Sequence, residues 1–387
     1  MWKSKSYGVT TMVKIRGFGV VLLAGLLLLP MMGMAAEVSG LYEAEVQVFS
    51  QKRSERATAM AAALAEVLVK VSARHDVAQM EGVAQLTRRP ARFLQQYRYR
   101  ALSEAQREQA LQEATRNDVS GADLQIVWFR FDKAAIDKVL RDNDLPVWGA
   151  TRPATLAWLA VQDEGKRYLL GADSQEPVRE LLTREAQRRG LALLLPLMDL
   201  QDQQALPFVD VWGRFREPIL QASLRYRTES VLVGRMYRTT SDEWQAQWTL
   251  LEGGQTQSWA AAGALPVEVI DEGVSGAIKV LASRYAPAAG GQVDLLPVTI
   301  IDVRTLRDYA RVTRYLKSLQ QVEYVQVAQV DADQVTFELD VEGGSEAIAQ
   351  TIALGHVLQR YQPPMETNGE LSSWTKRNTQ TYQLLPQ

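Results

Sequence analysis

The sequence predicts a mixed α/β (α+β) protein built from three small units. Alternating apolar and polar residues, typical of strands, recur between segments with helical periodicity along the whole chain. A break rich in Ala, Pro and Gly at 286–291 is the clearest linker, and a compact βαββα pattern follows it. We therefore expect units at 37–148, 149–285 and 292–387, after a leader at 1–36.

The leader has the composition of a secretory signal peptide. Four cations and no acid lie in the first 16 residues, and the uncharged stretch 17–36 ends in small residues up to Ala36. We expect cleavage there, with Met1 or Met12 as the start. The alternative is an uncleaved segment that tethers the protein to the inner membrane, although its apolar core is shorter than the roughly 20 residues that span a bilayer. The chain contains no Cys, which excludes a lipid-anchored leader, disulfides and thiolate sites together.

Local patterns define the expected first unit. Met60, Leu64, Val67, Leu68 and Val71 form one stripe of a helix over 54–72. The expected elements of this unit are strands at 42–48, 97–102 and 124–131, helices at 54–72, 83–95 and 134–140, and a mobile polar insertion at 103–117.

The second unit is expected to be a sandwich with a mixed sheet. The run 191–195 is continuously apolar, which indicates a strand buried on both faces. Ser174 is a plausible cap for a helix at 177–189. The other expected elements are strands at 155–161, 168–170, 230–237, 244–250 and 256–262, and helices at 218–226 and 267–285.

The third unit has the order of a ferredoxin-like βαββαβ fold. Thr305 and Asp308 form a capping box for its first helix. The expected elements are strands at 298–303, 322–330, 335–341 and 381–385, and helices at 305–319 and from Gly344 to about Tyr361.

The sequence argues against most catalytic chemistries. It has two His residues 281 positions apart, no Gly-x-Ser-x-Gly elbow and no Gly-x-x-x-x-Gly-Lys phosphate loop, so we expect no metal and no cofactor. Carboxylate-only hydrolysis needs just two acids, and Asp199, Asp202 and Asp210 are the best such set because they follow the run 191–195. The favoured alternative is that these acids cap short helices.

Two Trp-Gly turns are candidate ligand sites. Trp148 with Arg152, and Trp212 with Arg214, each combine an aromatic ring and a guanidinium suited to a sugar or peptide. The alternative is that each Trp covers the edge of a core.

The stretch 88–100 interleaves Arg with aromatic residues, a composition that can bind single-stranded nucleic acid. The strand period puts Tyr97 and Tyr99 on one face and Arg98 and Arg100 on the other. An exported protein is separated from the nucleic acid of the cytoplasm. We therefore expect the arginine face of this strand to be solvated, and we expect no nucleic-acid partner.

A series of short segments within about 37–285 carries a resemblance to a known family. The segments are Leu41–Val46, Val67–Ser72, Leu145–Gly149, Arg152–Pro153, Leu170–Ser174, Leu194–Pro196 with Asp199, Asp210–Gly213, and Val231–Arg235 with Trp248. Together they resemble the family called domain of unknown function 2066, an exported proteobacterial family of unknown activity. The resemblance departs at Ala73, where the pattern has Gly and would favour a positive-φ turn.

These observations together predict an exported periplasmic protein that is not an enzyme and acts as an interaction or scaffold module with protein partners of the cell envelope. One alternative is a binder of a small envelope ligand, a glycan or peptide, at the Trp212/Arg214 edge. The other is a carboxylate-dependent hydrolase that uses Asp199 and Asp210.

Overall fold

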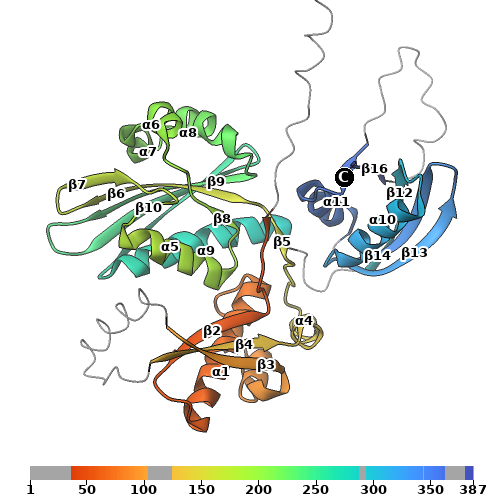
Figure 1. Cartoon of the computed structure of the whole chain (residues 1–387), viewed down its shortest axis with the longest axis horizontal. Helices are drawn as coiled ribbons and strands as arrows, with labels where there is room; N and C mark the ends of the chain where they lie inside the picture. Colours follow the sequence, from red (N-terminus) through yellow and green to blue (C-terminus); the bar gives the residue numbers. More distant parts are fainter. Residues whose placement is uncertain (1–35, 103–123, 287–292, 343, 362–379, 387) are drawn as a thin grey trace, which may run out of the picture. The chain divides into compact units, whose positions relative to one another are not determined.

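The computed structural model describes residues 36–102, 124–286, 293–342, 344–361 and 380–386, and every structural statement below refers to them. They form a mixed α+β fold with three main sheets of three, six and five strands, none closed into a barrel (Figure 1), so the predicted fold class is confirmed. The leader up to residue 35, the insertion at 103–117 and the linker from residue 287 lie outside the described residues.

A three-stranded antiparallel sheet and a long helix form the N-terminal part. The sheet has the order β2-β4-β3, and the apolar stripe predicted for the first helix is buried in the core beside it. The elements are β1 Ala36–Glu37, β2 Glu43–Val48, α1 Arg53–Ser72, α2 Glu81–Thr87, β3 Leu94–Ala101, β4 Gln125–Phe131 and α4 Lys133–Asp142.

Two details of this part differ from the sequence prediction. The helix expected over 83–95 ends at Thr87, because Pro90 has no N–H to continue the helical ladder and begins a short 3₁₀ turn instead. Ala73 closes α1 in the left-handed conformation with φ 56°, so the turn forms without the Gly that normally favours it.

Residues Tyr97 and Arg98 of β3 do lie on opposite faces, as predicted. Tyr97 packs against Tyr99 and Phe129, whereas the Arg98 guanidinium lies over the Trp128 ring, 4.4 Å from its centroid.

The middle part is the predicted sandwich around a mixed sheet. The strand order is β11-β10-β9-β6-β7, with β8 beside the start of β6, and β6 runs parallel to β8 and β9. Helices α5 and α9 cover one face and α6, α7 and α8 the other (Figure 1), with a separate apolar core on each side. The elements are β5 Thr151–Arg152, β6 Thr155–Asp163, β7 Lys166–Leu169, α5 Pro177–Arg189, β8 Leu193–Leu194, α6 Leu200–Ala205, α7 Phe208–Gly213, α8 Arg216–Ser223, β9 Ser230–Arg238, β10 Trp244–Glu252, β11 Gln255–Gly263 and α9 Pro266–Tyr285.

One buried tryptophan anchors each core of the sandwich. Trp158 donates its indole N–H to Ser223 Oγ at 2.9 Å under α8, and Trp248 donates to the Val269 carbonyl at 3.0 Å under α9. The Trp248 ring fits because Gly234 and Gly273 face it, where any Cβ would lie within 2.5 Å of ring carbons.

Two predictions for this part were wrong in detail. The apolar run 191–195 is not a strand buried on both faces: β8 has two residues and Leu194 is 42 % exposed, because the run crosses the rim of the sandwich. Glu176, not Ser174, is the residue before α5, and Ser174 instead accepts a hydrogen bond from the Glu176 N–H.

The C-terminal part has the predicted ferredoxin-like strand order with one additional strand. The sheet order is β13-β14-β12-β16-β15, and the Thr305–Asp308 capping box begins α10 as expected. The last helix ends at Leu354 instead of near Tyr361, and β15 then reverses the chain, so β16 runs parallel to β12. The elements are β12 Val293–Ile301, α10 Leu306–Ser318, β13 Val322–Val330, β14 Gln334–Glu342, α11 Gly344–Leu354, β15 Leu358–Arg360 and β16 Gln380–Leu384.

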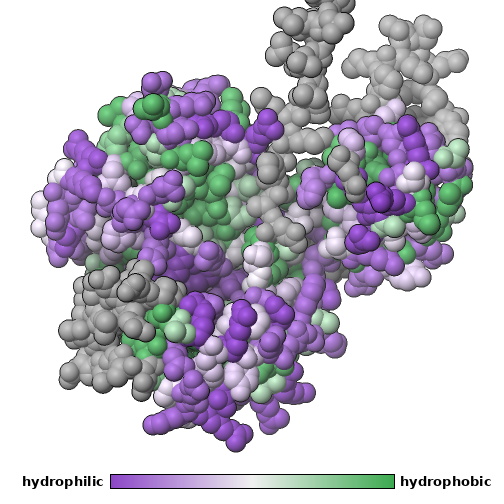
Figure 2. Space-filling model, viewed as in Figure 1, coloured by the Kyte–Doolittle hydropathy of each residue, from purple (hydrophilic) through white to green (hydrophobic). Residues whose placement is uncertain are grey.

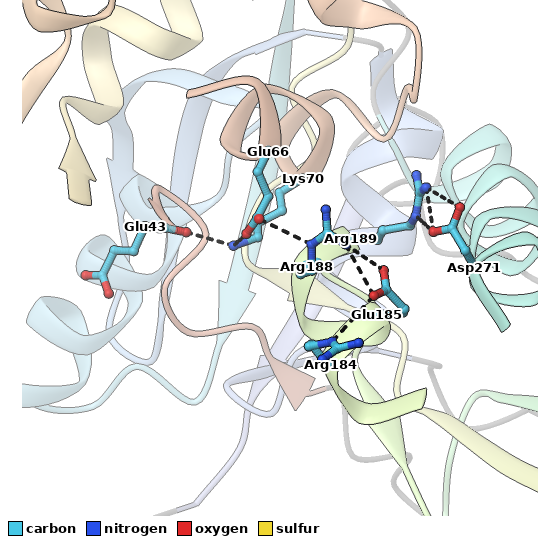
Figure 3. Close-up of polar contacts among 8 residues, drawn as sticks. All are labelled: Glu43, Glu66, Lys70, Arg184, Glu185, Arg188, Arg189 and Asp271. Atoms are coloured by element: carbon cyan, nitrogen blue, oxygen red, sulfur yellow. Dashed lines mark hydrogen bonds and ion pairs between the residues drawn. The ribbon is translucent and has the colours of Figure 1, made fainter. Parts of the chain in front are cut away.

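Charged side chains connect α1, α5 and α9 (Figure 3). Lys70 of α1 binds the Glu43 carbonyl at 2.7 Å and Glu66 at 2.9 Å, and Glu66 in turn lies 3.4 Å from the Arg188 guanidinium of α5. Arg189 of α5 forms a two-pronged ion pair with Asp271 of α9, at 2.6 and 2.7 Å. Across the residues described, no helix is both long and apolar enough to span a membrane.

Candidate functional site

The candidate residues from the sequence fall into two places. Trp148 and Arg152 lie in the interior where the N-terminal part meets the sandwich, whereas Asp199, Asp210, Trp212 and Arg214 belong to the α6–α8 layer.

Arg152 is a structural cation. Its side chain is 1 % exposed, and its guanidinium donates to four backbone carbonyls: Lys70 and Gly190 at 2.7 Å, and Trp148 and Gly149 at 3.0 Å. Two of these carbonyls belong to the C-terminal ends of α1 and α5, which carry partial negative charge. Burial lowers the pKa of Arg152 to about 9, so the side chain stays protonated at neutral pH.

Trp148 completes this buried arrangement. The Arg152 guanidinium lies over its ring, 4.1 Å from the centroid, and the ring is 2 % exposed. The backbone N–H of Trp148 donates to the Val71 carbonyl at 2.7 Å. The aromatic-plus-guanidinium pair predicted from sequence therefore exists, but it faces the interior and offers no surface to a ligand.

Asp199 and Asp202 form an ion-pair network with Arg225 and Tyr226. Asp199 caps α6 by accepting from the Asp202 N–H at 3.0 Å, and it binds Arg225 through both oxygens at 2.8 and 3.0 Å. Asp202 is fully buried and accepts from Arg225 at 2.8 Å, from the Met198 N–H at 2.9 Å and from the Tyr226 hydroxyl. This network fixes the start of α6 against the end of α8.

The pKa of Asp199 bears on the hydrolase alternative. The hydrogen bonds from Arg225 and from the Asp202 N–H lower the pKa of Asp199 to about 2, so this carboxyl holds no proton to donate at neutral pH. Glycoside hydrolysis requires one protonated acid beside a carboxylate. Asp210 lies in the first turn of α7, outside the Arg225 network. Of the three acids that the favoured alternative expected to cap short helices, Asp199 does so, whereas Asp202 and Asp210 lie in the first turns of α6 and α7.

Trp212 and Arg214 lie at the C-terminal end of α7, where they contact residues of β9 and β10. Trp212 stacks on Phe208, with ring centroids 5.3 Å apart, and the Arg235 guanidinium of β9 lies 5.8 Å from its ring. Arg214 donates to Thr249 Oγ1 at 3.3 Å, and burial followed by the charge of Arg235 lowers the pKa of Arg214. Within the described part of the chain neither arginine has a carboxylate partner, and Arg235 Nε has no hydrogen-bond partner.

The α6–α8 layer also exposes a set of large apolar side chains. Figure 2 shows green areas among purple ones over these helices. Three of them surround the Arg225 network, since Leu197 donates its N–H to the Tyr226 hydroxyl and Leu200 and Leu224 adjoin Asp199 and Arg225. Leu200 is 75 % exposed. We call this set the α6–α8 apolar surface; its members are Leu197, Leu200, Val209, Phe215 and Leu224.

Sequence reasoning missed this apolar surface. The signal was present as Leu-rich and Phe-containing segments in 194–224 that fit no helical stripe, but the pattern alone does not show which side chains the sheet covers. Among the described residues, no group of three or more His, Cys, Asp or Glu side chains is arranged to hold a metal ion.

By its fold, the chain is a mixed α+β protein in which helices cover the sheets and no barrel closes. Residues 35–149 match the family described as Domain of unknown function (DUF8605). The expected resemblance to domain of unknown function 2066 over 37–285 was therefore wrong, since the matching family is a different one and its match ends at residue 149. The segments on which that resemblance rested are short pieces of strand and turn. Such pieces reflect local structure and are weak evidence of common ancestry. No curated protein matches the chain.

Proposed function

We propose that this protein is a non-enzymatic interaction module of the cell envelope, exported to the periplasm, and that a partner protein binds its α6–α8 apolar surface. The observation that carries the proposal is the gathering of exposed Leu, Val and Phe side chains on one helical layer of a sandwich whose cores are otherwise closed. Exposed apolar side chains that gather in this way mark interaction sites in soluble proteins.

The base of this surface is rigid, which favours binding. Asp202 is buried and accepts hydrogen bonds from the Met198 N–H and from Arg225, and Arg225 also binds Asp199. The segments that carry Leu200 and Leu224 are therefore ordered before a partner binds, so binding does not have to supply the entropy cost of ordering them. Burial of apolar area contributes roughly 25 cal/mol per Å², so a few such side chains supply a binding core.

The test is affinity capture of the mature protein from cross-linked envelopes, with the double variant L200D/L224D beside the native chain. The matched control is L295D/L306D, which places the same two charges on exposed Leu residues of the C-terminal part. We expect one partner to be recovered reproducibly with the native and control proteins and lost with L200D/L224D. Recovery of no reproducible partner, or of the same partner with all three proteins, would refute the proposal.

Export is tested separately. Mass spectrometry of the protein purified from its own host gives the mature N-terminus, which we expect after Ala35 or Ala36. Retention of residues 17–36 would instead support the tethered alternative, in which the same parts are held at the inner membrane.

A second candidate is a small envelope ligand, a glycan or peptide fragment, at the Trp212/Arg214 edge. Its support is the pair of arginines, Arg214 and Arg235, for which the described part of the chain supplies no carboxylate partner, beside a half-buried indole. Ligand titration followed by tryptophan fluorescence tests it: the change on adding soluble cell-wall fragments should disappear in Trp212→Phe and persist in Trp259→Phe.

A further inference from the structure

A groove runs along one flank of α10 in the C-terminal part. It is a shallow, open hollow of about 510 Å³, and its lining includes Tyr309, Thr313, Arg314 and Lys317 of α10. Thr313 Oγ1 is buried there and has no hydrogen-bond partner in the described structure.

The lining residues of this groove all belong to α10, and α10 packs against β13. On the opposite flank, Arg311 donates to the Leu385 carbonyl at 2.6 Å and the Tyr315 hydroxyl lies against Gly355. Positions 313 and 317 lie roughly half a turn around the helix from these two residues, so they face the other way. Tyr309 stacks on Phe337 of β14, which pairs directly with Val327 of β13, so one end of the groove adjoins the middle of that strand.

The strand β13 is an open edge. It is the outermost strand of its sheet (Figure 1), so one side of its backbone pairs with β14 and the other has no neighbouring strand among the described residues. Its nine residues contain no Lys and no Pro, and Glu323 is the one charged residue. Register shifts at its two ends leave Tyr324–Val327 regularly paired, and Tyr324 is 58 % exposed.

The groove is basic at its mouth. Arg314 and Lys317 are exposed and form no ion pair with any described residue. An extended chain laid against β13 would point alternate side chains toward α10, and acidic groups there would meet these two cations.

We propose that the α10–β13 groove binds an extended acidic segment of a partner protein, which adds a strand to β13. Backbone hydrogen bonds to the open edge supply affinity, apolar side chains fill the groove beside Tyr309, and acidic ones pair with Arg314 and Lys317. Strand addition beside a helix is a known mode of peptide recognition. This site is independent of the α6–α8 apolar surface, because it uses only the C-terminal part.

The test uses the full protein and a fluorescent seven-residue peptide that alternates Glu and Val, with fluorescence anisotropy as the readout. We expect saturable binding that weakens at least tenfold in R314E/K317E. The matched control R88E/R89E changes the net charge equally at exposed sites in the N-terminal part and should bind as the native protein does. A melting temperature equal to the native value shows that each variant is folded.

Two further peptides separate strand addition from charge attraction alone. The version with Lys in place of Glu should not bind, and the version N-methylated at alternate residues should lose binding because it lacks the donors for the edge. Hydrogen exchange should show new protection in β13 and none in β11, an edge strand of the sandwich. No binding of the Glu peptide at millimolar concentration, equal binding of the N-methylated peptide, or β13-mediated dimerisation that excludes the peptide would each overturn the proposal.

Discussion

Replacing Arg152 by Met is the most informative change for the fold, because one side chain holds several segments together. The guanidinium donates to the carbonyls of Lys70, Trp148, Gly149 and Gly190, and the first and last of these lie at the ends of α1 and α5. Met has similar length but no donor, so the variant leaves these acceptors unpaired in a closed interior.

The magnitude follows from the two helix-end carbonyls. A buried carbonyl left without a partner costs about 1–3 kcal/mol, so Lys70 and Gly190 together account for about 2–6 kcal/mol. Removing the cation also removes its own cost of burial, which offsets part of this loss. We expect R152M to lower the free energy of unfolding by about 3 kcal/mol, a large share of the 5–15 kcal/mol typical of a folded domain.

The assay is urea unfolding followed by tryptophan fluorescence, together with hydrogen exchange. Amide exchange should rise together in the last turns of α1 and α5, since Arg152 links both. R167M is the matched control, because Arg167 is exposed and its side chain hydrogen-bonds only Gln162 among the described residues. A loss below about 1 kcal/mol in R152M, or exchange that rises in only one of the two helices, would refute this reasoning.

Three further outcomes are expected. Because the pKa of Asp199 is about 2 in the folded protein and 3.8 ordinarily, its contribution to stability is present above pH 3.8 and is lost as the pH falls toward 2. Asp199→Asn should therefore flatten the acid side of the stability curve, as unfolding measured across that range will show; an unchanged slope contradicts it. Gly273→Ala should cost about 1–3 kcal/mol, because the added Cβ would lie 2.3 Å from the Trp248 ring, and Trp248→Leu should recover part of that loss in thermal unfolding of the double variant. Arg188→Ala should cost less than about 1 kcal/mol in urea unfolding, since the side chain is 55 % exposed; a larger loss would mean that its contacts with Glu66 and Glu185 are stronger than those of a surface ion pair.

Periodicity predicted the elements that bury one continuous face. The α1 stripe from Met60 to Val71, the helix at 177–189 and the 322–330 and 335–341 hairpin all form as expected, because each buries its apolar face against the core of its own part. Local side-chain chemistry was equally informative where it is self-contained, as in the Thr305–Asp308 capping box.

Prediction failed where an element's end or exposure depends on distant neighbours. The last helix stops at Leu354 because Leu358–Arg360 pairs with β16, and the run 191–195 crosses a rim instead of filling a sheet. Neither fact is visible in a local apolar pattern, which has the same appearance in a buried strand and at a rim.

The sequence by itself determined the mixed α+β class, most of the strands and long helices, and the pairing of Trp148 with Arg152. Tertiary structure alone decided the surroundings of the two Trp-Gly turns. Arg152 and Trp148 are buried because two helix ends converge on the guanidinium, whereas Trp212 is half-buried at the end of α7 and has Arg235 of β9, instead of Arg214, over its ring. The difference is one of burial, which depends on contacts between segments far apart in the chain and not on the residues of either turn.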